Sequence, residues 1–304
     1  MYGPLADEGE LKQFSDIIVD AFQFPTDQLG AYYDMVGREN LRFWRVDGAL
    51  AGGLAALPIG QFFGGRSVPM AGLAVVATTA RSRGKGVAGQ LLKAVLEELR
   101  EKGVPISTLY PATVALYRRS GWEKAGTNCV IQMPADRIAV RDRTLQIREA
   151  TPVDDSAIRA LYGQWAATQS GNLDRSEAFW TRARSFRGQP TRGFVLCGER
   201  GIEGYVYLRT DAQGEGAWDE RVHDLVAATP AAARGLLTFF SDYRTTRRNI
   251  LWRSCPHDPL LMLLPESHHE IKWVSHWMLR IVDVAGALAA RGYPQHVTTE
   301  LHLA

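Results

Sequence analysis

The chain has 304 residues, 46% of them hydrophobic, a formal net charge of +2 and three cysteines. This length predicts two domains, or two and a fragment, with a sizeable core. No apolar run reaches the roughly 18 residues of a membrane span, and the first ten residues lack the features of a signal peptide, so we expect a cytoplasmic protein. The near-neutral charge gives no concentrated basic patch that would indicate nucleic-acid binding. The spacing of cysteines and histidines predicts neither a disulfide framework nor a metal site.

The first half of the chain alternates helices with strands. Hydrophobic periodicity and turn residues predict, in chain order, helices over Glu10 to Phe22 and Thr26 to Val36, two strands around a turn at Asp47-Gly48, a strand over Ser67 to Val76, a helix from Val87, a strand over Ile106 to Tyr110, a helix over Val114 to Ser120 and a strand over Trp122 to Met133. In the helix that begins at Val87, apolar residues recur every four positions as far as Leu99, while charged residues such as Lys93 take the other side. This amphipathic helix is expected to pack on a sheet.

The second half looks like a diverged copy of the first. Strands over Phe194 to Gly198 and Glu203 to Thr210 flank a turn, in the order of the earlier pair. The strand over Arg221 to Ala228 then enters a helix through Thr229-Pro230, without a pair of glycines. We therefore expect that this turn does not bind what the corresponding turn of the first half binds.

A third unit is expected to begin near residue 276. The sequence predicts a strand over Trp277 to Val282, a helix over Val284 to Ala290 and a strand over Val297 to Leu303. A fragment of this size cannot bury a core alone, so either it docks elsewhere or the chain is cut short.

The most informative stretch is the turn that leads into the long amphipathic helix. A strand ends there, Gly84 and Gly86 keep the turn free of side chains, and the helix begins with its unpaired N–H groups directed outward. Arg81, Arg83 and Lys85 add positive charge that suits a pyrophosphate or a ribose phosphate. Glycine turns before helices are common, so this pattern alone leaves a purely structural turn about equally open.

A second motif follows the glycine turn and the helix after it. It runs Tyr110-Pro111-Ala112-Thr113-Val114-Ala115-Leu116-Tyr117-Arg118-Arg119-Ser120-Gly121-Trp122. Together with the R-x-x-G-x-G loop that starts at Arg81, it resembles the GNAT superfamily, whose loop of this type grips the cofactor pyrophosphate. In that superfamily a later Y-x-x-x-G-[FWY] helix carries a tyrosine beside the thioester, and the two motifs in this order favour a functional site over a structural turn.

The resemblance narrows to the enhanced intracellular survival (Eis) family. It rests on Leu109 to Trp122, on the degenerate second half and on Trp277 to Asp283, which opens the third unit. It implies an α/β (α+β) fold of tandem GNAT domains, with mixed central sheets flanked by helices, and the start of a sterol-carrier-like domain. The implied domains are residues 1–135 with the acetyl-CoA site, 145–275 as a degenerate second GNAT-like domain, and 276–304 as the incomplete third domain.

The resemblance also implies an activity and a site. The activity is acetyl transfer from acetyl-CoA to amino groups of aminoglycosides, polyamines or lysines, within a homo-oligomer that is usually a hexamer. The implied cofactor-binding residues are Ala74, Val75, Val76, Arg81, Ser82, Arg83, Gly84, Lys85, Gly86, Val87, Ala112 and Thr113, and the implied general acid is Tyr117.

Tyr117 has a chemical reason for this role. The leaving thiolate has a conjugate acid of pKa about 8.5, and a phenol of pKa about 10 can stabilise it by a hydrogen bond or by proton donation. The alternative is that Tyr117 is only an aromatic residue packed on the sheet.

The attacking amine must also lose a proton, and in the Eis family the base is the carboxylate at the end of the third domain. This sequence stops at Ala304, shortly after that domain opens. Ala304 could reach the site by an unusual path, a water chain could replace it, or the chain is a truncated form. We favour truncation, which predicts that activity rises when a complete third domain is restored.

Two functions follow from the sequence. The first is an amine acetyltransferase, and the second is a non-catalytic CoA-binding or interaction protein that keeps a GNAT scaffold. The intact loop at Gly84 and Gly86, together with Tyr117, favours the enzyme, because a scaffold need retain neither feature.

Overall fold

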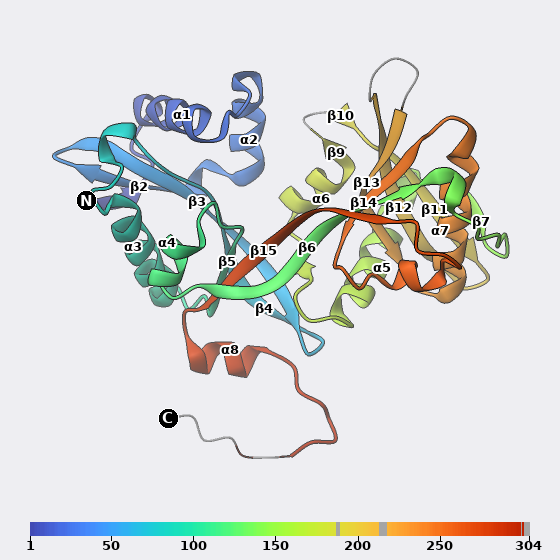
Figure 1. The fold of residues 1–304 in the computed structure, drawn as a ribbon. Helices are drawn as coiled ribbons and strands as arrows, with labels where there is room; N and C mark the ends of the chain where they lie inside the picture. Colours follow the sequence, from blue (N-terminus) through green and yellow to red (C-terminus); the bar gives the residue numbers. More distant parts are fainter. Residues whose placement is uncertain (187–188, 213–217, 299, 301–304) are drawn as a thin grey trace. The chain divides into compact units, whose positions relative to one another are not determined.

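The computed structural model describes residues 1–186, 189–212, 218–298 and 300 (Figure 1). The chain folds into two units, each with helices packed on a mixed β-sheet. Unit 1 comprises Met1–Ala125, Ala166–Ala178 and Trp277–Ala304, and unit 2 comprises Gly126–Trp165 and Phe179–His276. The α/β (α+β) class expected from the sequence is confirmed.

Unit 1 is a mixed sheet with helices on both faces. Its strands are β1 (Tyr2–Pro4), β2 (Leu41–Val46), β3 (Ala49–Phe63), β4 (Arg66–Thr78), β5 (Ile106–Leu109), β8 (Leu173–Asp174) and the end of β15 (Glu270–Ile281). Its helices are α1 (Glu8–Phe22), α2 (Leu29–Val36), α3 (Val87–Glu101), α4 (Val114–Arg119) and α8 (Val284–Ala290), with short 3-10 turns at Thr26–Gln28, Arg38–Asn40 and Ala80–Ser82. The strand order is β1-β2-β3-β4-β5-β15, and neighbours run antiparallel except β4 and β5.

The helices of unit 1 form two layers. The pair α1 and α2 covers one face of the sheet, and α3 and α4 cover the other (Figure 1). The side chain of Asp7 accepts a hydrogen bond of 2.8 Å from the backbone N–H of Glu10, so α1 begins slightly before the predicted helix. In α3 the predicted apolar stripe is confirmed, because Leu91, Leu92 and Val95 are fully buried against the sheet.

Unit 2 has strands and helices of its own. Its strands are β6 (Glu123–Pro134), which begins in unit 1, β7 (Gln146–Glu149), β11 (Arg192–Gly198), β12 (Gly201–Ala212), β13 (Trp218–Ala227), β14 (Asn249–Ser254) and the short pair β9 (Ser185–Phe186) and β10 (Gln189–Pro190). Its helices are α5 (Asp155–Ala167), α6 (Glu177–Arg184) and α7 (Pro230–Asp242), with 3-10 turns at Ala135–Arg137, Pro152–Asp154, Tyr243–Thr245 and Pro259–Leu263. The strand order is β6-β14-β13-β12-β11-β7, and neighbours run antiparallel except β13 and β14.

The sheet portions of the two units share one plan. Each begins with three antiparallel pairs, continues with a parallel pair joined by a long helix, α3 or α7, and ends with an antiparallel pair. The last strand of each sheet belongs to the other half of the chain: β15 pairs with β5, with Met278 opposite Leu109, and β6 pairs with β14. The repeats therefore exchange their final strands.

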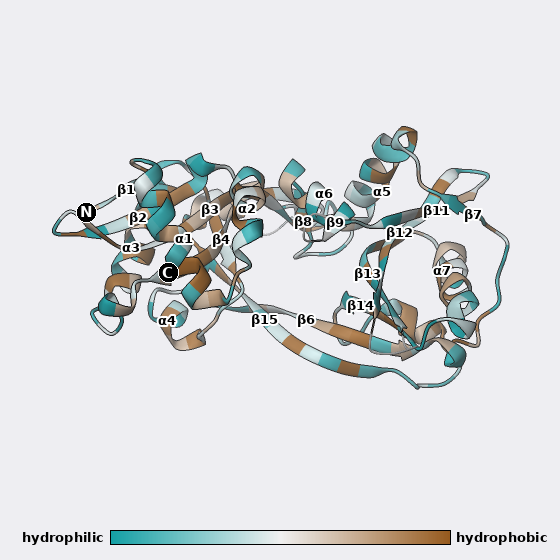
Figure 2. Cartoon of the chain, turned by 90° about the horizontal axis from the view of Figure 1, so that it is seen from above, coloured by the Kyte–Doolittle hydropathy of each residue, from teal (hydrophilic) through white to brown (hydrophobic). Residues whose placement is uncertain are grey.

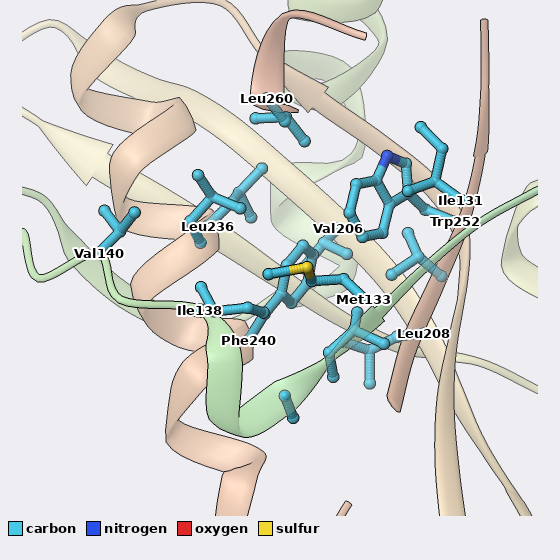
Figure 3. Packing of buried hydrophobic residues seen from close by; sticks show 14 of the residues in the cluster. Ile131, Met133, Ile138, Val140, Val206, Leu208, Leu236, Phe240, Trp252 and Leu260 are labelled. Atoms are coloured by element: carbon cyan, nitrogen blue, oxygen red, sulfur yellow. The ribbon is translucent and has the colours of Figure 1, made fainter. Parts of the chain in front are cut away.

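The core of unit 2 makes this exchange visible (Figure 3). There Ile131 and Met133 of β6 lie among Leu236 and Phe240 of α7 and Trp252 of β14, and each of the five is at most 1% exposed. A buried side chain of this size stabilises the fold by about 1.5–3 kcal/mol relative to an exposed one. The strand that follows the first repeat is thus part of the second core.

The third unit expected from residue 276 takes a different form. Its helix has the predicted bounds, but its strand is the end of β15, which starts at Glu270 and alternates between hydrophilic and hydrophobic residues (Figure 2). This strand end pairs with β5 and belongs to unit 1. The expected strand Val297 to Leu303 lies largely outside the described residues. A sterol-carrier-like domain at 276–304 stays a prediction.

Candidate active site

A strained bulge interrupts β4 where it faces β3. Val75 has φ +46°, a left-handed conformation that a β-branched residue rarely adopts. The pairing shifts there, so that Val75 and Val76 of β4 face the single residue Leu54 of β3. A bulge of this kind takes backbone N–H and C=O groups out of the ladder and makes them available to a ligand. The sequence-predicted segment Ala74 to Val76 coincides with it.

The strands β4 and β5 pair over only part of their length. Their parallel pairing runs from Met70 opposite Ile106 to Gly72 opposite Thr108. The bulge at Val75 lies beyond this paired segment, so the backbone there is free of β5. This is the edge at which ligands bind in open α/β sheets, beyond the carboxyl ends of parallel strands.

The turn between β4 and α3 keeps its backbone accessible. Gly84 and Gly86 have φ +75° and +78°, and no described atom lies within 4 Å of the point where a Cβ would stand on either residue. Glycine adopts this conformation at little cost. The Thr79 hydroxyl donates a 2.8 Å hydrogen bond to Ser82 Oγ, which is buried and fixes the start of the turn.

The helix α3 begins without a side-chain cap from the described part of the chain. Its N-cap is Gly86, and Gln90 is the first residue whose N–H reaches an acceptor of the helix, the Gly86 carbonyl at 3.1 Å. The N–H groups of Val87, Ala88 and Gly89 therefore remain for a ligand. These groups and the positive end of the helix dipole could hold an anion.

Three cations flank this turn. Lys85 and Arg83 are exposed, and Arg83 pairs with Asp20 at 2.7 Å between two side chains that are more than half exposed. Such a surface pair is weak and easily exchanged. The Arg81 guanidinium donates a long hydrogen bond of 3.4 Å to the Leu50 carbonyl. Each of these cations can turn toward a phosphate without breaking a buried ion pair.

The side chain of Tyr117 on α4 packs in the hydrophobic cluster between α3 and the sheet. It is 5% exposed and shares a hydrophobic cluster with Leu92 of α3 and with Val76 of the bulge. Burial raises the pKa of the Tyr117 phenol to about 12. The phenol therefore keeps its proton at neutral pH and can donate it. Ala112 and Thr113 are exposed on the loop from β5 into α4.

The structure places the sequence-predicted residues in unit 1, and Val76, α3 and Tyr117 share one hydrophobic cluster there. The bulge, the uncapped start of α3 and the buried phenol belong to elements that pack against one another. Two contributors have no clear signal in the sequence: the strain at Val75, because no glycine marks it, and the pairing of β15 with β5, because these strands are far apart in the chain.

The corresponding turn of unit 2 is closed by its own side chains. The Thr229 hydroxyl accepts a hydrogen bond of 3.1 Å from the N–H of Ala232 and donates one of 2.8 Å to the Glu203 carboxylate. The start of α7 therefore already has a cap and an anion beside it. This supports the expectation that the second turn does not bind a phosphate.

The side chains of the described ranges, 1–186, 189–212, 218–298 and 300, include no cluster of three His, Cys, Asp or Glu that could hold a metal ion. The three cysteines are free thiols, with Cys129 buried and Cys255 exposed. None of the described helices is long and apolar enough to cross a membrane.

Comparison with known proteins decides the family. Models described as acetyltransferase (GNAT) domains match residues 5–125 and 171–281. A GCN5-related N-acetyltransferase from Anabaena variabilis, known as a crystal structure, is 34% identical with a TM-score of 0.93, over 100% of this chain and 78% of that one. The chain belongs to the GCN5-related N-acetyltransferase (GNAT) family. The tandem GNAT organisation predicted from the sequence is confirmed.

Other GNAT relatives refine this result. N-acetyltransferase Eis of Mycobacterium tuberculosis is 25% identical over 88% of this chain and 73% of its own length. Eis1 from Mycobacterium abscessus has the same fold, with 22% identity and a TM-score of 0.77 over 98% of this chain and 77% of that one. These relatives confirm the resemblance to the Eis family. An uncharacterized N-acetyltransferase of Streptomyces griseus is 27% identical over 76% of this chain, which spans 61% of that relative's length. The chain thus spans about three fifths of the length of curated relatives such as this one.

The family fixes the kind of donor. GNAT acetyltransferases use acyl-CoA, and a yeast N-myristoyltransferase solved with bound myristoyl-CoA shares the fold, at 10% identity and a TM-score of 0.61 over 92% of this chain and 82% of that one. An acyl-CoA carries a pyrophosphate, which suits the anion site at α3.

Proposed function

We propose that this GNAT protein is an acetyl-CoA-dependent N-acetyltransferase that acts on the amino groups of aminoglycosides, polyamines or lysines. One observation carries the proposal. Unit 1 combines the uncapped start of α3, the bulge at Val75 and the buried phenol of Tyr117, whereas the side chain of Thr229 caps the equivalent turn in unit 2. The sequence resemblance to the Eis family extends the proposal to a homo-oligomer, and the composition of the sequence extends it to a cytoplasmic location.

The residues of the turn fit the cosubstrate. A pyrophosphate needs several N–H donors and space beside the backbone, and the stretch Ser82 to Val87 offers both, since its glycines have no described atom within 4 Å on the Cβ side. Arg81, Arg83 and Lys85 would neutralise its charge. Ala112 and Thr113 would lie by the thioester end. The backbone of Ala74 to Val76 would hold the pantetheine arm and the acetyl carbonyl.

The proposed chemistry is direct transfer. The thioester supplies an activated acetyl carbon, to which the neutral amine forms a C–N bond while the C–S bond breaks. The phenol of Tyr117 donates its proton to the departing sulfur, and the amine proton leaves to solvent. With its pKa raised to about 12, the phenol is protonated at the pH of the reaction, and after CoA leaves it regains its proton from solvent. An alkylammonium of pKa about 10.4 must lose its proton before it can attack.

The experiment measures free thiol released from acetyl-CoA in the presence of an aminoglycoside, a polyamine or a lysine peptide. We expect amine-dependent release, and we expect Tyr117→Phe to lower kcat by about 10²-fold without weakening CoA binding. Tyr162→Phe is the matched control, because Tyr162 of α5 in unit 2 is equally buried at 5% exposure. Absence of thiol release with every amine, together with CoA binding in calorimetry, would favour a non-catalytic CoA-binding protein. Absence of both would overturn the assignment of the site.

A further inference from the structure

The strand beside the proposed acid comes from the far end of the sequence. β15 ends in unit 1 with Met278 opposite Leu109 and Arg280 opposite Ser107 of β5. The GNAT match to the second repeat extends to residue 281 and therefore includes this strand end. Met278 is fully buried in the cluster that contains Tyr117. The second repeat thus contributes side chains to the surroundings of Tyr117.

Arg280 of this strand lies flat against the turn that ends α4. Gly121 has φ +87°, and a Cβ at that position would stand 2.6 Å from Nη1, 2.7 Å from Cζ and 3.0 Å from Nε of Arg280. Because three atoms of the guanidinium are this close, its plane rests on the Gly121 backbone. Glycine suits the turn, because the left-handed conformation strains other residues and a Cβ at Gly121 would displace the Arg280 guanidinium.

The contacted turn is tied to Tyr117 itself. The N–H groups of Ser120 and Trp122 donate hydrogen bonds of 3.0 and 3.1 Å to the carbonyl oxygen of Tyr117. The indole Nε1 of Trp122 donates a bond of 3.2 Å to the Ser107 carbonyl, directly opposite Arg280 in the sheet. A shift of the Gly121 turn would therefore move the backbone of Tyr117.

A packing role alone does not explain an arginine here. Its Nε is buried and has no hydrogen-bond partner among the described residues. An unsatisfied buried N–H is costly, and a methionine would fill the same volume without that cost. The guanidinium does offer two things that methionine lacks: a rigid plane that matches the glycine backbone, and a positive charge beside the C-terminal carbonyls of α4.

We propose that Arg280 is a positioning residue for Tyr117, bracing the Ser120 to Trp122 turn so that the phenol keeps its place beside the bulge. This rests on the proposed function, because it assigns Tyr117 a role in acetyl transfer. It also gives the second repeat a part in the reaction, although its own turn is closed.

The kinetic test uses the full chain with Arg280→Met and Arg280→Lys. We expect Arg280→Met to lower kcat about tenfold with little change in KM for acetyl-CoA, because a displaced acid affects the chemical step and not cofactor binding. Arg280→Lys, which keeps the charge but not the plane, should recover part of this loss. In a Tyr117→Phe background, Arg280→Met should lower kcat hardly any further, because the acid that Arg280 positions is already absent. An additive loss in the double variant would overturn the proposal.

A second readout does not depend on activity. Fluorotyrosine is incorporated, and the ¹⁹F resonance of Tyr117 is identified by its loss in Tyr117→Phe. We expect Arg280→Met to shift or broaden this resonance. Arg118→Met is the control: Arg118 is also on α4, but its side chain is exposed and pairs with Glu123 at 2.6 Å. An unmoved resonance in Arg280→Met would overturn the positioning role. A moved resonance in a protein that releases no thiol would leave that role standing and reject the proposed acetyl transfer.

Discussion

Trp122 holds Tyr117 in two ways: its backbone N–H donates a 3.1 Å hydrogen bond to the Tyr117 carbonyl, and its ring meets the phenol ring edge-on, with centroids 6.3 Å apart. The indole is fully buried and also bonded to the Ser107 carbonyl of β5. Tryptophan combines a large apolar surface with one polar donor, which suits a position between helix and strand. It fixes the helix that carries the proposed acid onto the strand beside it.

Trp122→Phe tests this connection. The change removes the indole donor and leaves a small cavity, so we expect the free energy of unfolding to fall by about 2 kcal/mol in urea titrations. We also expect kcat to fall while KM for acetyl-CoA stays nearly constant. Trp252→Phe in unit 2 is the control, because Trp252 is 1% exposed and its indole likewise donates a hydrogen bond, to Asp258 at 2.8 Å. Equal kinetic losses in both variants would contradict a special role for Trp122.

The anion site is tested by two glycines at opposite ends of α3. Gly84 and Gly103 both have positive φ, +75° and +67°, and neither has a described atom within 4 Å on its Cβ side. Alanine should therefore cost each position a similar roughly 1–2 kcal/mol of backbone strain. We expect only Gly84→Ala to weaken CoA binding in calorimetry, because only that turn adjoins the start of the helix. Equal affinities in the two variants would argue against a pyrophosphate at Gly84.

The pH dependence follows from the raised pKa of Tyr117. Burial lifts that pKa to about 12, so the phenol stays protonated over the working range. We expect kcat/KM to rise from about pH 6.5 to about 9.5 as the amine loses its proton, with no falling limb. Tyr117→Phe should show the same shape at a lower level. The phenol's contribution to stability is present below pH 10 and is lost as the pH rises from 10 to about 12. A falling limb near pH 8 that disappears in Tyr117→Phe would contradict the raised pKa of the phenol, although it would still fit a proton-donating role for Tyr117.

The closed turn of unit 2 predicts one CoA site per chain. Thr229→Ala removes the cap of α7 and should lower the free energy of unfolding by about 1 kcal/mol. We expect calorimetry to give one CoA per chain before and after this change, since the Glu203 carboxylate still lies near the helix start. A second equivalent of bound CoA in either protein would contradict the closed turn.

Local patterns in the sequence predicted the helices of unit 1 and the residues proposed for the site. The apolar stripe of α3 and the glycines before it act over a few residues, so their spacing alone places them on a helix and a turn. The exchange of β6 and β15 could not be predicted in this way, because pairing between distant strands depends on the whole topology. Arg280 was missed for the same reason: its contact with Gly121 exists only when β15 lies beside β5. The strain at Val75 is held by surrounding packing and contradicts local preference.

The acid stability of unit 1 should depend on Glu98 of α3. Burial would raise the pKa of this carboxyl, but hydrogen bonds from Arg42, Lys102 and Tyr2 outweigh burial and hold it at about 2, below its ordinary 4.5. A folded-state pKa below the unfolded value stabilises the fold above pH 4.5, and this contribution is lost as the pH falls from 4.5 to about 2. Its size at neutral pH is roughly 1–2 kcal/mol after screening.

Glu98→Gln should therefore unfold at lower urea concentration than the unchanged protein at neutral pH, and the difference should vanish as the pH approaches about 2. Glu123→Gln is an instructive control, because the pKa of Glu123 is also held at about 2, chiefly by Arg118. Glu123 is 59% exposed where Glu98 is 19% exposed, so water and salt screen its pair far more strongly. We expect little effect of Glu123→Gln in moderate salt. Equal losses in the two variants would mean that the position of Glu98 between α3 and the sheet adds nothing to the strength of its ion pair.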